Sequence, residues 1–328
     1  MNNRSYSTLL TVAVFVYNHE QYIEQTLLSV LRQKCDFEIK IIVCDDCSTD
    51  SSYPIISNIA RQYPNLVFPI RNERNLGLNQ SFYNVIKLID SKYIAILGGD
   101  DYWIIDNKLQ LQVSVMEEDE KISYVHTAFT SFREKDNSYL QNGNINWYWR
   151  VKNDPLAKLI SFLIDRWSGY PLASTSCMRT CVLQKGLKDY LDILMNPYVV
   201  GEGTFINVSV CMSGGKYAYL PLITTVYTIR ENSLSHYFKK DDLFRYRYNY
   251  FRLKEYILRK FSLSKLQEKK VRKEMIAQLY YDAIQLNQKK QFRKLFSDIS
   301  DFEIIVLDVT YFSKRLHNVL CRYFKIFS

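Results

Sequence analysis

The chain has 328 residues, a length that suffices for one large domain or two fused domains. Of these residues 47% are apolar, 10 are glycine and 7 are proline, a composition that excludes a disordered or collagen-like protein. It contains no signal-peptide pattern and no apolar run of about 20 residues, which disfavours a secreted or membrane-spanning protein. Positive charge is concentrated at the end of the chain. Residues 1–236 have 22 basic and 24 acidic side chains, whereas residues 237–328 have 21 basic and 10 acidic side chains.

Strand and helix patterns alternate over the first 132 residues, which predicts an α/β fold with a largely parallel sheet. The expected strands are 10–16, 38–44, 66–70, 93–97 and 122–132, and the expected helices are about 20–33, 51–62, 78–89 and 106–118. A polar stretch with an Asn-Gly turn at residues 142 and 143 then interrupts the pattern. We therefore expect the first half-domain to end near residue 135.

The following region is less regular. The expected elements are a helix at 155–165, a strand at 172–178, a helix at 204–213 and two paired strands at 217–220 and 224–229. Beyond His236, apolar and aromatic side chains recur at the three- and four-residue spacing of a helix. The expected organisation is two halves of one domain, 1–135 and 136–237, followed by a basic helical module at 238–328.

Seven cysteines form an odd set dispersed among apolar neighbours, which indicates reduced thiols in a cytosol. Cys44 and Cys47 have the spacing of a redox dithiol or of half a zinc site. A cysteine site would need a second pair at matching spacing, and Cys177 and Cys181 do not supply one. We therefore interpret the thiols near residue 45 as incidental to two neighbouring carboxylates.

Polar motifs follow three of the expected strands: "FVYNHEQY" at 15–22, "CDDCSTD" at 44–50 and "YIAILGGDDYW" at 93–103. Ligands bind beyond the carboxyl ends of strands in open α/β sheets. Adjacent carboxylates at Asp100 and Asp101, preceded by two glycines, suit a hard divalent cation that holds a diphosphate. The alternative is a solvated turn in which Asp100 caps the next helix.

With these motifs in order, the sequence resembles the bacterial polysaccharide-type members of glycosyltransferase family 2, which have the GT-A fold. The resemblance rests on "VAVFVYNHEQYIEQTLLSVLRQ" (12–33), "IIVCDDCSTDSS" (41–52), "NERNLGLNQSFYN" (72–84) and "YIAILGGDDYW" (93–103). It covers residues 8–135 firmly and continues weakly to about 237. It implies a Rossmann-like, mostly parallel sheet flanked by helices, with the donor-binding half at 1–135 and the acceptor-binding half at 136–237.

The resemblance also implies roles for individual residues. Tyr17 would lie against the nucleotide base, and Asp46 would accept the N3–H of uracil or thymine. Asn75, with Gly77, would belong to the loop that closes over the donor. Asp100 would bind on the ribose or metal side, and Asp101 would bind Mn²⁺ or Mg²⁺ directly. Phe15 departs from the family, in which proline is common at that position.

The second half departs further from the family pattern. The catalytic base is usually an aspartate before a helix, whereas this chain offers Glu202 between two glycines. The alternative is that Glu202 only favours the start of the helix through its dipole. In place of a Tyr-Arg-x-His motif the chain has Tyr227 and Arg230, so Arg230 is the candidate for the diphosphate, and His236 is a weaker candidate ligand.

The basic end of the chain allows several interpretations. "FRYRYNYFRLKEY" at 244–256 interleaves arginine with aromatics, as nucleic-acid grooves do, but its helical spacing favours packing, so no nucleic acid is expected. Residues 311–328 have one apolar and one basic helical face, which fits an anionic membrane surface or a helix packed on a core.

The resemblance therefore implies an inverting, metal-dependent enzyme that transfers a sugar from a UDP- or dTDP-sugar to a glycan or lipid-linked acceptor in capsule or O-antigen synthesis. The expected location is the cytoplasm or the inner face of the cell membrane. The alternative is a non-catalytic nucleotide-sugar-binding or assembly subunit of a glycan synthesis complex. No Gly-x-Gly-x-x-Gly follows the first strand, which disfavours a dehydrogenase.

Overall fold

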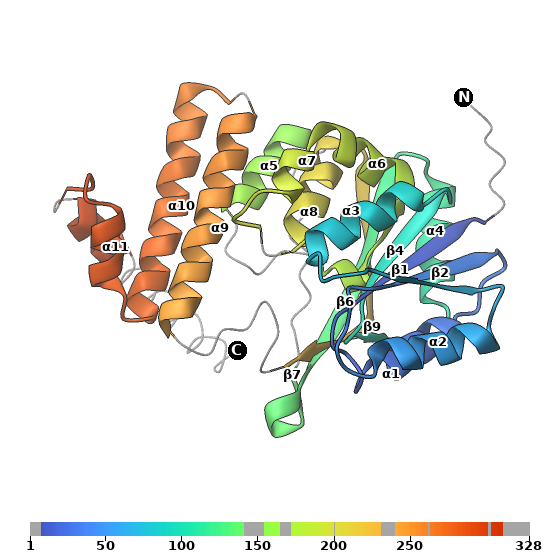
Figure 1. Cartoon of the computed structure of the whole chain (residues 1–328). Helices are drawn as coiled ribbons and strands as arrows, with labels where there is room; N and C mark the ends of the chain where they lie inside the picture. Colours follow the sequence, from blue (N-terminus) through green and yellow to red (C-terminus); the bar gives the residue numbers. More distant parts are fainter. Residues whose placement is uncertain are drawn as a thin grey trace, which may run out of the picture. The chain divides into compact units, whose positions relative to one another are not determined.

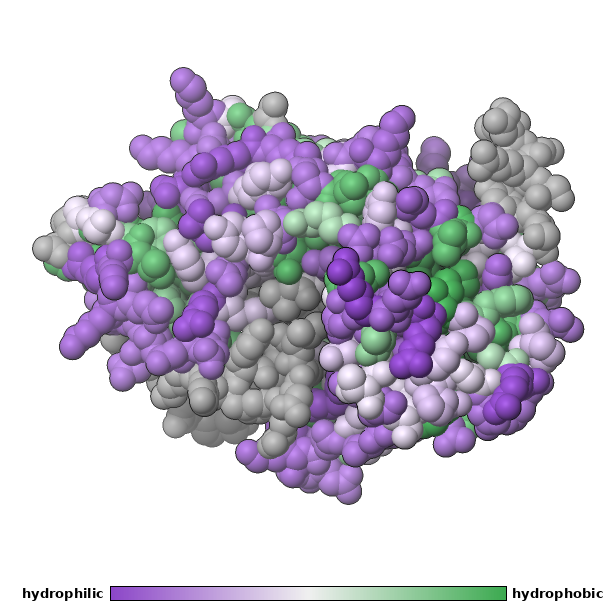
Figure 2. Space-filling model, viewed as in Figure 1, coloured by the Kyte–Doolittle hydropathy of each residue, from purple (hydrophilic) through white to green (hydrophobic). Residues whose placement is uncertain are grey.

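The computed structural model describes residues 8–140, 154–164, 172–199, 201–230, 240–261, 263–300 and 303–310 (Figure 1). The chain divides into two compact units, Met1–His236 and Tyr237–Ser328. None of the described helices is long and apolar enough to cross a membrane. On the face seen in Figure 2, hydrophilic residues predominate and apolar ones gather in small groups, as on ordinary protein surfaces.

The first unit is built on one mostly parallel sheet with the strand order β3-β2-β1-β4-β8-β6-β9-β5, with β7 paired to β6. The strands are β1 (Leu10–Val16), β2 (Ile39–Asp45), β3 (Val67–Arg71), β4 (Tyr93–Gly98), β5 (Tyr102–Trp103), β6 (Ile122–Arg133), β7 (Ser138–Leu140), β8 (Cys177–Arg179) and β9 (Lys216–Ile229). β1, β2, β3 and β4 pair in parallel, as do β6 and β9, whereas β5, β7 and β8 pair antiparallel. The predicted α/β fold class is confirmed.

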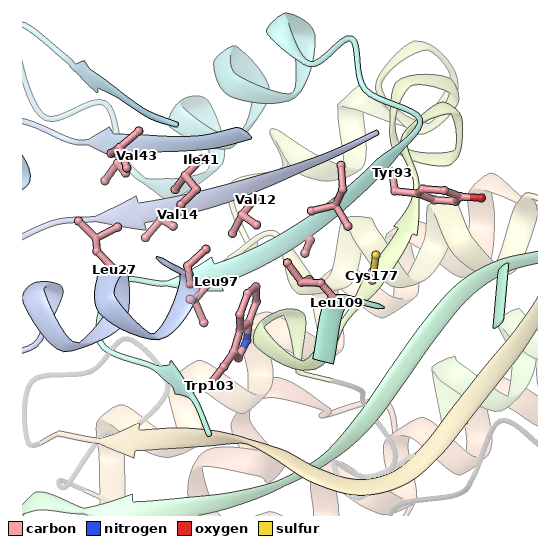
Figure 3. Packing of buried hydrophobic residues seen from close by; sticks show 14 of the residues in the cluster. Val12, Val14, Leu27, Ile41, Val43, Tyr93, Leu97, Trp103, Leu109 and Cys177 are labelled. Carbon is pink, nitrogen blue, oxygen red and sulfur yellow. The ribbon is translucent and has the colours of Figure 1, made fainter. Parts of the chain in front are cut away.

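Helices cover both faces of this sheet (Figure 1). They are α1 (Ile23–Leu31), α2 (Ser52–Gln62), α3 (Leu78–Leu88), α4 (Lys108–Glu118), α5 (Pro155–Ile164), α6 (Thr180–Asp189), α7 (Leu191–Leu194) and α8 (Gly203–Met212). Val12 and Val14 pack toward α1, α2 and α4 (Figure 3), whereas Ala13 and Phe15 pack toward α3, α6 and α8. Because central strands are buried on both faces, their sequences are continuous apolar runs.

Two predicted strand assignments are wrong. The segment predicted as a strand at 172–178 begins with a 3-10 turn (Ala173–Thr175), and only β8 is extended. The hydroxyls of Thr175 and Ser176 bond back to the carbonyl of Leu172, which favours a turn over a ladder. The two strands predicted to pair at 217–229 are the single strand β9, which pairs with β6 and has register shifts between Leu220 and Thr225, a segment that contains Pro221.

The second unit contains the helices α9 (Lys240–Lys260), α10 (Lys265–Gln285) and α11 (Lys289–Leu295), and residues 303–310 are also helical. Ser264 and Gln267 form a capping box at the start of α10. Phe251 of α9, Phe292 of α11 and Phe296, which directly follows α11, pack together in this unit. The amphipathic helix predicted at 311–328 lies outside the described residues.

A buried lysine lies at the start of α4. Lys108 is fully buried, its Nζ lies 2.7 Å from Gln112 Oε1 and 4.2 Å from the ring centre of Trp103, and Gln112 in turn donates to the carbonyls of Val125 and Thr175. Burial lowers the pKa of Lys108 to about 7. The protonated form of the Lys108 amine therefore destabilises the folded state at neutral pH.

The lowered pKa of Lys108 predicts a pH dependence of the free energy of unfolding. Between pH 7 and about 10 the unfolded chain keeps the Lys108 proton that the folded chain has lost, so the stability of the wild type should rise with pH in this interval. Lys108→Met lacks that titration, so the unfolding free energy of the wild type should improve relative to the variant from pH 7 to 9. Urea unfolding of both proteins at several pH values measures this difference, and parallel pH profiles would contradict it.

Candidate active site

The motifs after β1, β2 and β4 meet at one edge of the sheet. The N–H of Asp46, just after β2, bonds the carbonyl of Val16 at the end of β1 over 2.8 Å. The N–H of Gly99, just after β4, bonds the carbonyl of Phe15, also over 2.8 Å. The three polar motifs are thus held together by backbone hydrogen bonds at the carboxyl ends of neighbouring parallel strands, where ligands bind in open sheets.

Asp46 is buried and organises the loop that follows β3. Asn72 Nδ2, Leu76 N and Ser81 Oγ donate to its Oδ1 over 2.7, 2.8 and 3.0 Å. Gly77 N donates to Oδ2 over 2.8 Å. A carboxylate offers about four acceptor positions, two on each oxygen, so Oδ2 keeps the capacity for one further donor.

One position in the loop that Asp46 holds has a backbone conformation that favours glycine. Gly77 has φ +82°, a conformation that other residues rarely adopt, and its N–H also lies 3.1 Å from Asn75 Oδ1. Cys47, in the turn after Asp46, also has a positive φ of +60°. Tyr17 is 43% exposed, and its neighbour Asn18 donates its N–H to Ser48 Oγ, which joins the loops after β1 and β2.

Asp45 and the thiols have structural surroundings. Asp45 is fully buried, lies 3.3 Å from Arg71 Nε and accepts the N–H of Ser48, so it holds the turn rather than facing the loop around Asp46. Cys44 lies in the core, and burial raises its thiol pKa to about 12, which disfavours the reactive thiolate. The cysteines in the described residues are free.

The second carboxylate pair, Asp100 and Asp101, follows β4. A Cβ on Gly98 would lie 3.0 Å from Asp100 Oδ1 and 3.4 Å from Asp101 Oδ2, so both carboxylates approach the space that this glycine leaves open. A Cβ on Gly99 would lie 2.9 Å from the carbonyl oxygen of Phe15, which excludes a side chain there. No helix begins at Asp100, since α4 starts at residue 108. The helix-cap alternative for Asp100 is therefore wrong.

Asp101 is buried and held by two donors. Its Oδ2 accepts Ser174 Oγ over 2.5 Å, and its Oδ1 accepts the N–H of Thr228 over 3.0 Å. Burial and then the neighbouring Asp100 raise the pKa of Asp101 well above its ordinary value. A cation beside the pair would offset both effects, because it stabilises the ionised carboxylates.

Asp100 faces a group of cationic and aromatic side chains. Arg230 lies with one guanidinium nitrogen 2.8 Å from Asp100 Oδ2 and 2.9 Å from His19 Nε2. The guanidinium also lies 5.4 Å from the ring centre of Tyr22, and Tyr22 donates its hydroxyl proton to Glu134. Arg230 Nε is buried without a hydrogen-bond partner in the described part of the chain, so it retains a donor for a ligand.

His19, Tyr22 and Ser174 were not singled out from the sequence. His19 and Tyr22 lie inside the motif after β1, but only the tertiary contact with Arg230 distinguishes them. Burial lowers the pKa of His19, which favours the neutral imidazole. Ser174 is 73 residues from Asp101, and no local pattern marks it.

Glu202 precedes α8 on a separate loop of the same unit. A Cβ on its neighbour Gly201 would lie 3.6 Å from Leu78, the first residue of α3, which follows the loop held by Asp46. The Glu202 side chain makes no capping hydrogen bond to α8 within the described residues, and burial raises its pKa. His236 lies outside the described residues.

The metal prediction can be tested against these carboxylates. The described residues contain no group of three or more His, Cys, Asp and Glu side chains that could hold a metal ion. Mg²⁺ and Mn²⁺ bound to a nucleotide need only one or two carboxylates, since phosphate and water supply the rest. Two convergent carboxylates, one with a raised pKa, fit that requirement.

Residues 11–179 match the model of the family described as glycosyl transferase family 2. The chain therefore belongs to this family, as the sequence motifs indicated. It is 25% identical over 227 residues to the UDP-Glc:alpha-D-GlcNAc-diphosphoundecaprenol beta-1,3-glucosyltransferase WfaP of Escherichia coli, covering 69% of this chain and 80% of WfaP. It is 34% identical over 94 residues to the dTDP-rhamnosyl transferase RfbG of Shigella flexneri, covering 27% and 32%.

Other relatives match over a smaller share of their length. Uncharacterized proteins of Mycobacterium tuberculosis and Mycobacterium bovis are 34% identical over 108 residues, which is 33% of this chain and 31% of theirs. The chain thus spans about a third of those relatives.

Solved glycosyltransferases have the same fold. TarS of S. aureus, in complex with UDP-GlcNAc, has a TM-score of 0.56 at 20% identity, covering 83% of this chain and 72% of TarS. The mannosyltransferase PcManGT of Pyrobaculum calidifontis, in complex with GDP-Man and Mn²⁺, has a TM-score of 0.57 at 13% identity, covering 95% and 81%. These similarities establish the GT-A fold.

Proposed function

We propose that the protein is an inverting glycosyltransferase that transfers a sugar from a UDP- or dTDP-sugar to a glycan or lipid-linked acceptor in cell-surface polysaccharide synthesis. The observation that carries this proposal is the meeting of Asp46, the Asp100–Asp101 pair and Arg230 at one edge of the sheet. The named activities of WfaP and RfbG, with UDP- and dTDP-sugars, support the choice of donors. In this proposal residues 1–135 bind the donor and 136–237 bind the acceptor.

The base and diphosphate would contact different parts of this site. Asp46 Oδ2, which has one donor in the free protein, accepts the N3–H of uracil or thymine, and Tyr17 lies against the base. Asn75 belongs to the loop that closes beside the base. Arg230 stays paired with Asp100 through one guanidinium nitrogen and directs a free donor, Nε, to the diphosphate.

A divalent cation, Mn²⁺ or Mg²⁺, would be held by Asp101 together with Asp100. Such a cation supplies positive charge that stabilises the departing diphosphate. Ser174 and Thr228 keep the Asp101 carboxylate oriented through their hydrogen bonds.

Glu202 is the proposed general base. It takes the proton from the acceptor hydroxyl while that oxygen forms a bond to the anomeric carbon and the bond to the diphosphate breaks. The electron pair of the broken bond leaves with the nucleotide diphosphate. Two observations support Glu202: its loop adjoins the start of α3, and its burial raises the carboxyl pKa, which makes the carboxylate a stronger base.

A thermal-shift screen tests donor and cation together. Saturating UDP- or dTDP-sugar should raise the Tm of the full chain by about 5–10 °C. Mn²⁺ should enlarge the shift for the wild type and for the control Asp189→Asn, which changes a half-buried carboxylate on α6 that pairs with Lys185. It should not enlarge the shift for Asp101→Asn.

Two results would contradict the proposal. Stabilisation by GDP-sugars alone would refute the assignment of Asp46 to uracil or thymine, and an equal shift in the presence of a chelator would refute the cation. The non-catalytic alternative differs in turnover. Binding of a donor without slow release of its nucleotide, across the whole donor panel, would favour the assembly subunit.

A further inference from the structure

Two aromatic side chains of the hairpin formed by β6 and β7 and one of β5 gather together, and we call Tyr102, Phe132 and Tyr139 the aromatic platform. Phe132 on β6 and Tyr139 on β7 are paired residues whose ring centres lie 5.1 Å apart. The hydroxyls of Tyr139 and Tyr102 lie 3.3 Å apart. Tyr139 is 62% exposed and Phe132 is half-buried. The hairpin extends beyond the rest of the sheet in Figure 1.

The strand register places these side chains on one face of the sheet. Two residues of β9 are involved: Val226 pairs with Tyr102 of β5, and Thr228 pairs with Phe132 of β6. Residues two apart on a strand point to the same face, as do directly paired residues, so Tyr102 and Phe132 share a face. Val226 and Thr228 between them are almost completely buried. Tyr102 and Tyr139 therefore bridge over β9 and β6, with their hydroxyls in contact.

The platform adjoins the carboxylate pair through two links. Tyr102 directly follows Asp101 in the chain, and Thr228, opposite Phe132, donates its N–H to Asp101. A third link joins the other end of the hairpin, since Glu134 accepts the hydroxyl of Tyr22, whose ring lies beside Arg230. The platform is thus a neighbour of the groups assigned to the cation and diphosphate.

The position of the platform separates it from the base-binding loops. In the sheet order, Asp46 follows β2 on one side of β4, whereas β6, β9 and β5 lie on the other side. A donor whose base lies at Asp46 and whose diphosphate lies at Asp100 would extend across the sheet toward this second side. The aromatic platform is therefore on the acceptor side of the reacting carbon.

We infer that the aromatic platform binds a pyranose ring of the acceptor glycan. This inference rests on the proposed function and extends acceptor binding beyond residues 136–237 to Tyr102 and Phe132. The C–H face of a pyranose is apolar and stacks on the electron-rich face of an aromatic ring, while its equatorial hydroxyls need polar partners at the rim. The hairpin supplies both, because Glu134 and Asp136 lie in the turn that joins β6 to β7, where Arg133 and Ser138 orient Asp136. A purely apolar ligand would leave these carboxylates against hydrocarbon.

The inference is tested with octyl glycosides of glucose, N-acetylglucosamine, galactose and rhamnose as acceptor probes. Saturation-transfer NMR on the full chain, loaded with UDP and the diamagnetic cation Mg²⁺, should show contact with the sugar ring protons of at least one probe. Tyr139→Ala should weaken the affinity for that probe about fivefold to tenfold, because a stacking partner is lost. Tyr139→Phe keeps the ring and should change affinity less than twofold.

The matched control is Tyr63→Ala, which removes another exposed tyrosine, at the end of α2, and should leave glycoside binding unchanged. Unchanged affinity in Tyr139→Ala overturns the inference, and so does saturation transfer confined to the octyl chain, which would indicate a lipid surface. Absence of ring contact for every probe also overturns it. UDP binding, measured in the same samples, separates these results from failure of the proposed function and verifies that each variant is folded.

Discussion

Replacing Asp46 with alanine is expected to abolish measurable binding of UDP and UDP-sugars, with affinity falling at least about 100-fold. The carboxylate does two things in the proposed site: it accepts the base N3–H, and it accepts four donors from residues 72–81 that shape the loop. A hydrogen bond to a charged group contributes about 1.5–3 kcal/mol, and the alanine variant loses the base contact and the loop geometry together. Isothermal titration of UDP measures the effect.

The neighbouring thiols provide the control for Asp46. Cys47→Gly places glycine at a φ of +60°, which glycine adopts without strain, and Cys44→Ala removes only a core sulfur. Both variants should bind UDP within about twofold of the wild type. Retained binding in Asp46→Ala, or loss of binding in the cysteine variants, would contradict the assignment of this turn to base recognition. Urea unfolding should show a loss of roughly 2–4 kcal/mol for Asp46→Ala, because buried donors lose their partner.

The strands that deliver the site were predictable because each is buried on both faces. β1, β2 and β4 are mainly apolar, with Lys40 and Asp45 as the charged exceptions in β2, and polar motifs follow each strand. Both their position and the edge where Asp46, Asp100 and Asp101 meet therefore follow from the sequence. The second half of the unit was less predictable. β9 carries Pro221 and a register shift, and its pairing with β6 joins segments about 95 residues apart, which no local pattern reveals.

The supporting residues of the site could not be identified from local spacing. Ser174 reaches Asp101 from a 3-10 turn, and Arg230 reaches His19 from 211 residues away. One indirect signal was present: Gly99 has no space for a Cβ because Phe15 and His19 lie against it. A glycine before a carboxylate pair thus marks a close approach of two chain segments, but it does not identify the segment that approaches.

Replacing Glu202 with glutamine is expected to lower the rate of nucleotide release from a bound donor sugar at least about 100-fold, while donor affinity changes less than twofold. The amide has nearly the same shape as the carboxyl group but cannot take a proton, and a positioned general base contributes about 10²- to 10⁴-fold to a rate. Glu202→Asp keeps a carboxylate, on a side chain that is one methylene shorter, and should retain part of the activity. Glu118→Gln, an exposed change at the end of α4, is the matched control and should leave the rate unchanged.

The pH dependence distinguishes a base from a group that only shapes the pocket. Burial raises the pKa of Glu202 above 4.5, and a base acts only when deprotonated, so the wild-type rate should fall as pH decreases through that raised pKa. The residual rate of Glu202→Gln should lack this acidic limb, because the titrating group is gone. If glutamine retains full activity, or if the limb persists in the variant, another group takes the proton. Since the Glu202 side chain makes no capping bond to α8 within the described residues, a change in folding stability large enough to mimic these effects is not expected.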